Sequence, residues 1–172
     1  HDEIRLTKEG LGMDPDVQFA VPAEVVETFR ASVGSHAEER SAWQARLLES
    51  SRREEWKCWT SAPDLSSVVW PEFPASEKGV ATRKSSGKVL NAIAASVPKL
   101  LGGSADLAGS NGSLLAGERV ITGSDFGGRN LYFGVREHAM ASICNGMALH
   151  GALVPYCATF LIFHDYMRPA VR

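Results

Sequence analysis

The chain contains 172 residues, a length that suits one domain with a substantial core or parts of two larger domains. Its 18 Lys and Arg residues nearly balance 20 Asp and Glu residues, so neither nucleic acid nor an anionic membrane is expected as a partner. Three cysteines without a C-x-x-C spacing argue against a disulfide framework and a zinc knuckle, and they favour a reducing, intracellular compartment.

Both ends of the sequence suggest an excerpt of a longer chain. Residues 1–5 are mostly charged, and no apolar run that could be a signal peptide or a membrane span follows them. Residues 171–172 fall inside a helical pattern that has not yet reached a stop signal. We therefore expect a cut or processed chain.

Residues 1–75 are predicted to form a helical and irregular connecting segment. Pro22 suits the first turn of a helix, and Gly34 suits its end. Ser35 and Glu38 then have the spacing of a capping box, which predicts that a second helix starts directly after Gly34. Farther along, prolines interrupt the pattern, and irregular chain held by aromatic anchors is expected around Trp56, Trp59 and Trp70.

Helical and strand patterns alternate from residue 76 onward. Thr82 is expected to cap a helix, and further helices are expected to begin near Glu137 and at Thr159 or Phe160. Short apolar segments between these helices predict strands at residues 100–101, 131–133 and 153–158. This alternation with short joints predicts an α/β fold in which helices flank a partial parallel sheet. Ligands of such sheets bind at the carboxyl ends of the strands, here in the joints 102–110, 134–137 and 158–160.

Two features near these joints could bind a charged ligand. The loop Gly-Gly-Ser-Ala-Asp-Leu-Ala-Gly-Ser-Asn at residues 102–111 has glycines that admit a ligand and polar groups that could orient it, although such loops are usually ordinary turns. Arg83 lies near a helix start, where a guanidinium and free amides can jointly hold a phosphate. A solvated arginine is the more common interpretation of Arg83 taken by itself.

Glu137 lies at a predicted junction between a strand and a helix. A carboxylate in the first turn of a helix ordinarily serves only the helix dipole. A carboxylate that lies against apolar neighbours can instead share a proton with a heterocyclic nitrogen, which is the work of a general acid. The adjacent His138 has no second histidine at metal-ligand spacing, so a structural role is preferred for it.

Three aromatic residues follow the last predicted strand at intervals of three: Phe160, Phe163 and Tyr166. Adjacent members of this series can share one side of a helix, which is typical of core packing. The same spacing also suits a pocket for a flat ring, and sequence spacing alone does not separate the two interpretations. Cys144 and Cys157 lie in apolar stretches and are expected to be buried, unreactive thiols.

Three motifs taken together resemble transketolase, a thiamine diphosphate-dependent ketol transferase. They are Gly-Gly-Ser-Ala-Asp-Leu, then Gly-Val-Arg-Glu-His-Ala-Met, and then Ala-Thr-Phe-Leu-Ile-Phe-His-Asp-Tyr-Met-Arg-Pro-Ala-Val-Arg, in that order and spacing. The resemblance is close over residues 80–172 and looser over residues 2–43. Dihydroxyacetone synthase shares enough of these motifs to remain an alternative.

The resemblance implies roles for seven residues. Glu137 matches the glutamate that hydrogen-bonds the aminopyrimidine ring of the cofactor and so activates it. The aromatic residues Phe160, Phe163 and Tyr166 match the pocket around that ring, and Asp106 matches an aspartate near the cofactor. Arg83 and Ser110 match residues that hold the terminal phosphate of the sugar. The implied reaction moves a two-carbon unit from a ketose phosphate to an aldose phosphate, as in the pentose phosphate pathway and the Calvin cycle.

The sequence also departs from the family pattern. The Gly-Asp-Gly motif that holds the diphosphate and a divalent cation, Mg or Ca, does not occur in it, and no residue here is expected to bind metal. The resemblance implies that residues 1–75 follow the diphosphate-binding domain and that residues 76–172 begin an incomplete pyrimidine-binding domain. It further implies a homodimer in the cytoplasm or a plastid, and an isolated chain without activity. A remnant that serves as a structural or interaction subunit is the alternative.

Overall fold

The computed structural model describes residues 2–172, which belong to two compact units, 1–53 and 54–172. In the first unit, helix α1 spans Asp2–Gly10 and helix α2 spans Ala23–Glu49. Arg5 pairs with Asp16 at 2.8 Å, and Lys8 Nζ donates to the carbonyl of Val17 at 2.8 Å, so side chains of α1 hold the loop that follows it.

The predicted break at Gly34 is wrong, because α2 runs through it for 27 residues. Ser35 Oγ donates to the carbonyl of Ser32 at 2.9 Å, so it does not cap a second helix. A glycine inside a helix costs only about 1 kcal/mol relative to alanine. Good helix formers on both sides, including the run 37–40, outweigh that cost.

Helix α3, Arg53–Thr60, occupies part of the segment for which irregular chain was expected. That prediction is wrong for these residues, since two acidic residues in the first turn and a basic residue in the last turn suit the helix dipole. The buried Lys99 ammonium donates to the carbonyls of Cys58 at 3.3 Å and Trp59 at 3.2 Å, and also to the carbonyl of Ser61. These bonds satisfy carbonyls at the end of α3 that the helix itself leaves free.

The second unit is an α/β layer built on three parallel strands. The strands are β1, Leu100–Ser104, β2, Asn130–Tyr132, and β3, Val154–Ala158, and their order in the sheet is β2-β1-β3. The helices are α4, Thr82–Ser96, α5, Ala108–Asn111, α6, Glu137–His150, the 3-10 helix η1, Leu161–Phe163, and α7, His164–Val171. The predicted α/β fold with a partial parallel sheet is therefore confirmed.

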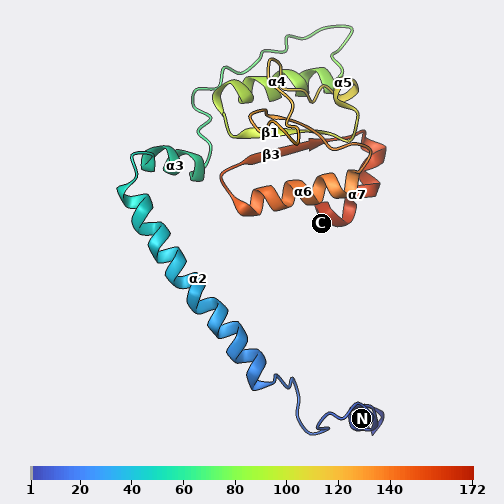
Figure 1. Cartoon of the computed structure of the whole chain (residues 1–172). Helices are drawn as coiled ribbons and strands as arrows, with labels where there is room; N and C mark the ends of the chain where they lie inside the picture. Colours follow the sequence, from blue (N-terminus) through green and yellow to red (C-terminus); the bar gives the residue numbers. More distant parts are fainter. Residues whose placement is uncertain (1) are drawn as a thin grey trace. The chain divides into compact units, whose positions relative to one another are not determined.

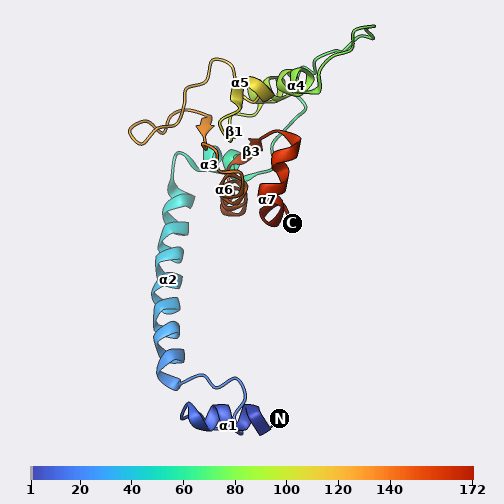
Figure 2. The same cartoon turned by 90° about the vertical axis from the view of Figure 1, so that its right-hand side faces the viewer.

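Helices cover both faces of the sheet, with α4 on one face and α6 and α7 on the other (Figures 1 and 2). Each face has its own apolar cluster. Leu100 and Leu115 pack with the buried end of α4, whereas the fully buried Met140 of α6 packs with Phe133 and Cys144. The central strand contains Gly-Gly at 102–103 because a Cβ there would overlap backbone carbonyls of both neighbouring strands.

Two further helix starts differ from the prediction. Ala81, rather than Thr82, precedes the first residue of α4, and no side chain caps that helix. No helix begins at Thr159 or Phe160, because Phe160 still has an extended backbone with ψ of 150°. The 3-10 helix η1 follows, and the chain becomes α-helical at His164. Among residues 2–172, no helix has the length and apolar character needed to cross a bilayer.

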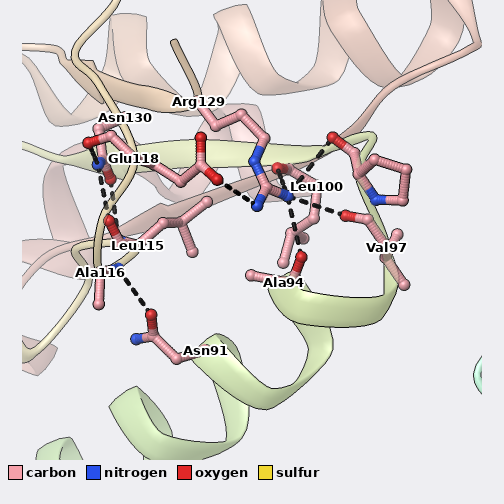
Figure 3. Close-up of polar contacts among 10 residues, drawn as sticks. Asn91, Ala94, Val97, Leu100, Leu115, Ala116, Glu118, Arg129 and Asn130 are labelled. Atoms are coloured by element: carbon pink, nitrogen blue, oxygen red, sulfur yellow. Dashed lines mark hydrogen bonds and ion pairs between the residues drawn. The ribbon is translucent and has the colours of Figure 1, made fainter. Parts of the chain in front are cut away.

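Arg129 joins the end of α4 to the long loop before β2. Its Nη1 donates to the carbonyls of Ala94 and Val97, both at 3.1 Å, and its Nη2 pairs with Glu118 Oε1 at 2.7 Å (Figure 3). The neighbouring Asn130 is buried and holds the same loop through the backbone of Leu115. The Arg129 guanidinium also keeps the pKa of Glu118 below its ordinary value.

Candidate functional site

The carboxyl ends of the three parallel strands meet at one edge of the sheet. Ser104, the last residue of β1, is in register with Tyr132 at the end of β2 and with Ala158 at the end of β3. The segments that leave this edge carry Asp106 after β1, Glu137 after β2 and Phe160 after β3. The parallel topology therefore gathers the joints that the sequence marked as candidate binding segments.

Glu137 is the first residue of α6, and only 8% of its surface is exposed. The Thr159 hydroxyl, which follows β3, donates to Glu137 Oε1 at 3.4 Å. The guanidinium of the neighbouring Arg136 donates to the carbonyl of Phe133 at 2.9 Å. This arrangement requires the left-handed backbone of Gly134, with φ of 69°, in the turn before α6. The carboxylate is thus buried beside a hydroxyl, whereas its nearest arginine in sequence bonds the backbone.

The three aromatic residues form one continuous series. The ring centroids of Phe160 and Phe163 are 6.0 Å apart with planes at 26°, and those of Phe163 and Tyr166 are 6.1 Å apart at 42°. Phe160 is 38% exposed and Tyr166 is 66% exposed, so the series is not closed into the core of this unit. Exposed aromatic rings in such a series suit contact with a flat ligand ring.

A groove of about 650 Å³ lies between the start of α4, the end of α5 and the segment after β3. Its lining includes Arg83, Ser110 and Asn111 on one side and Thr159 and Phe160 on the other. Arg83 Nη1 donates to the carbonyl of Ser110 at 3.4 Å, so the two predicted phosphate ligands are neighbours although 27 residues separate them in sequence. Since Thr159 also touches Glu137, the groove adjoins the buried carboxylate.

Asp106 lies two residues beyond the end of β1 and is exposed to solvent. Its backbone is left-handed, with φ of 61°, a conformation that aspartate tolerates better than most residues. Ser104 Oγ accepts a hydrogen bond from the amide of Leu107 at 3.0 Å and so closes the turn around Asp106. Asp106 follows the same strand edge as Glu137, but it is not among the residues that line the groove.

Two residues at this site lie in predicted binding segments but are not among the predicted site residues. Thr159, in the joint 158–160, both contacts Glu137 and lines the groove. Its hydroxyl directly after a strand, at the edge where ligands bind, is the signal that singles it out. Asn111 also lines the groove, and in the described part of the chain its buried Nδ2 has no hydrogen-bond partner.

Other titratable groups lie away from the groove. His138 is exposed on α6, and among residues 2–172 no three His, Cys, Asp or Glu side chains gather in a way that could hold a metal ion. Cys144 is buried as predicted, but Cys157 is only partly buried, so the prediction of a buried thiol is wrong for Cys157. The Cys144 thiol hydrogen-bonds the Cys157 sulfur, which lowers the pKa of Cys157 and raises the pKa of Cys144.

Residues 78–172 match the family described as transketolase, pyrimidine binding domain, and residues 1–61 match the family described as transketolase, thiamine diphosphate binding domain. Among curated proteins, the chain is similar to the transketolases of Halalkalibacterium halodurans and Geobacillus stearothermophilus, with 42% identity to each over 178 residues. These alignments cover 99% of this chain but only 27% and 26% of the two relatives.

Solved structures give the same result. A transketolase from Campylobacter jejuni superimposes with a TM-score of 0.75 at 36% identity, over 98% of this chain and 26% of that one. A transketolase from Pichia stipitis in complex with sedoheptulose-7-phosphate gives a TM-score of 0.77 at 33% identity, over 99% of this chain and 27% of that one. The chain therefore matches one portion of much longer proteins.

Proposed function

The chain belongs to the transketolase family, and from that premise we propose that it works as part of an enzyme that transfers a two-carbon ketol unit from a ketose phosphate to an aldose phosphate. The observation that carries this proposal is the adjacency of a buried carboxylate, Glu137, to a groove lined by Arg83, Ser110 and Phe160. Burial favours the protonated form of a carboxylic acid, which can then share its proton with a ligand. A guanidinium forms charge-assisted hydrogen bonds with a phosphate.

The residues of this chain fit the aminopyrimidine end of thiamine diphosphate. In the proposed site, Phe160, Phe163 and Tyr166 contact the ring, because they form one continuous aromatic series and two of them are exposed. Thiamine diphosphate supplies the electron sink for breaking and forming the carbon–carbon bond when it is bound. Glu137 holds the proton that its carboxylate shares with a ring nitrogen, and the Thr159 hydroxyl keeps that carboxylate oriented.

The proposed sugar phosphate lies in the groove, with its phosphate at Arg83 and Ser110. The guanidinium supplies a charge-assisted hydrogen bond, and the exposed Ser110 hydroxyl supplies a second donor. Asp106 is assigned to the cofactor side, because it follows the central strand at the same edge. The relative from Pichia stipitis binds sedoheptulose-7-phosphate, which supports a phosphorylated ketose as the substrate class here.

The remaining parts of the site are proposed to come from outside this chain. A divalent cation and the cofactor diphosphate need ligands that the sequence does not provide, and a second subunit of a homodimer is the proposed source. In this arrangement residues 1–75 connect the diphosphate-binding domain to a pyrimidine-binding domain that begins near residue 76. The proposed cellular role is that of a cytoplasmic enzyme of sugar phosphate metabolism.

The test is ketol transfer by the full-length polypeptide that contains this chain. With thiamine diphosphate and Mg²⁺ present, the ketose phosphate should yield an aldose phosphate that is two carbons shorter. The acceptor aldose phosphate should yield a ketose phosphate that is two carbons longer. Omitting the aldose phosphate should stop product formation, which distinguishes transfer from simple cleavage. Absence of transfer with several ketose phosphates, in a folded and cofactor-loaded protein, would rule the proposal out.

A further inference from the structure

Arg83 and Ser110 belong to different helices, so their spacing depends on how α4 and α5 are held together. The two helices approach at the level of their backbones. A Cβ at Gly87 of α4 would lie 2.8 Å from the carbonyl oxygen of Gly112, and a Cβ at Gly112 would lie 2.7 Å from that of Arg83. Both positions therefore need glycine, and Gly112 also ends α5 with a left-handed φ of 68°.

Asn91 lies one turn farther along α4 than Gly87 and binds the loop that follows α5. Its Nδ2 donates to the carbonyl of Gly87 at 2.9 Å and to the carbonyl of Leu114 at 3.0 Å. Its Oδ1 accepts a hydrogen bond from the amide of Ala116 at 2.7 Å (Figure 3). One amide group thus fastens the loop that follows α5 to the helix that carries Arg83.

We propose that Asn91 is a positioning residue that sets the distance between Arg83 and Ser110 and thereby the preference for phosphorylated sugars. This inference rests on the proposed function. Asn91 bridges backbone groups and contacts neither predicted phosphate ligand through its side chain. Asn130 and Tyr156 hold Leu115 and Ser113 of the same loop, but their side chains do not bond α4. Without Asn91, the loop after α5 loses the two side-chain hydrogen bonds that join Leu114 and Ala116 to α4, and the contact between Arg83 and Ser110, already 3.4 Å long, lengthens.

Loss of Asn91 should affect phosphorylated substrates selectively, because only the phosphate of a substrate contacts Arg83 and Ser110 in the proposed site. A ketose without a phosphate reacts at the same cofactor but does not use Arg83 or Ser110. Asn91→Ala should therefore raise KM for the ketose phosphate while kcat stays close to the wild-type value. The ratio of kcat/KM between a ketose phosphate and the same ketose without its phosphate should fall about tenfold, since small displacements of a binding group have effects of this order or larger.

The experiment measures this ratio in the full-length protein for wild type, Asn91→Ala and Asn91→Asp. Aspartate can still accept from the Ala116 amide but cannot donate to the carbonyls of Gly87 and Leu114, so its ratio should also fall. The control is Ser96→Ala, which removes a hydrogen bond to the carbonyl of Ser67 from the opposite end of α4 and should leave the ratio within about twofold of wild type.

The positioning role of Asn91 is overturned if Asn91→Ala leaves the ratio of kcat/KM unchanged, which includes an equal loss of kcat/KM with both substrates. If the alanine variant does not fold, an unchanged ratio in Asn91→Asp has the same meaning. If the wild-type protein transfers no ketol unit from either substrate, the proposed function itself is wrong. If the wild-type protein prefers the ketose phosphate and Asn91→Ala has the same preference, only the inference about Asn91 is wrong.

Discussion

Replacing Arg129 by alanine should destabilise the second unit strongly. The guanidinium donates to the carbonyls of Ala94 and Val97 at 3.1 Å, and both residues are at least 95% buried. Ala94 lies in the last turn of α4 and Val97 directly follows the helix, where carbonyls lack an intrahelical amide partner, although the Val97 carbonyl also accepts from the amide of Leu100 at 3.1 Å. A hydrogen bond to a charged group contributes about 1.5–3 kcal/mol, so losing two bonds of this kind should lower the free energy of unfolding by about 3–6 kcal/mol.

Arg119 provides the matched control, because it is an arginine on the same loop whose ion pair with Asp125 is exposed. Such pairs contribute about 0–1 kcal/mol, and Arg119→Ala should change the free energy of unfolding by no more than that. Urea unfolding followed by circular dichroism gives both values by linear extrapolation. The reasoning about Arg129 is refuted if the two variants lose the same stability, or if Arg129→Ala loses less than about 1 kcal/mol.

Two further predictions concern the apolar cluster beneath α6. Met140→Ala should cost about 2–5 kcal/mol in urea unfolding, because Met140 is fully buried, whereas Ile143→Ala on the exposed face of the same helix should cost less than about 1 kcal/mol. Equal costs would contradict this packing. Cys157 should react with iodoacetamide at a rate that rises with pH and has its midpoint below that of an ordinary thiol, because the Cys144 thiol stabilises its thiolate. Cys144→Ala should move that midpoint upward, and an unchanged midpoint would show that the Cys144 thiol does not stabilise the Cys157 thiolate.

Features set by local chemistry were predictable from the sequence. The start of α6 at Glu137 and the strand that ends at Ala158 follow from apolar periodicity and from short joints, which the structure reproduces. The parallel arrangement also followed, because alternation of strands and helices leaves few other solutions. The resemblance of three motifs to one family was confirmed by the family matches over residues 78–172 and 1–61.

Features set by competition between weak local signals were not predictable. Gly34 looked like a stop, but its small penalty does not end a helix whose neighbours all favour helix. Part of the tryptophan-rich segment forms α3, whose end is capped by Lys99 from about forty positions away in the sequence. The contacts of Thr159 with Glu137 and of Asn91 with Ala116 likewise join distant positions, and no periodicity encodes them.

The proposed role of Glu137 in activating the cofactor is tested most directly by measuring ketol transfer by Glu137→Gln in the full-length protein. Glutamine keeps the size of the side chain but cannot share a proton, so the rate should fall about a hundredfold or more. His138→Gln is the control, since His138 is the exposed neighbour on the same helical turn and its loss should leave the rate within about twofold of wild type. A Glu137→Gln enzyme that keeps the wild-type rate would contradict the account.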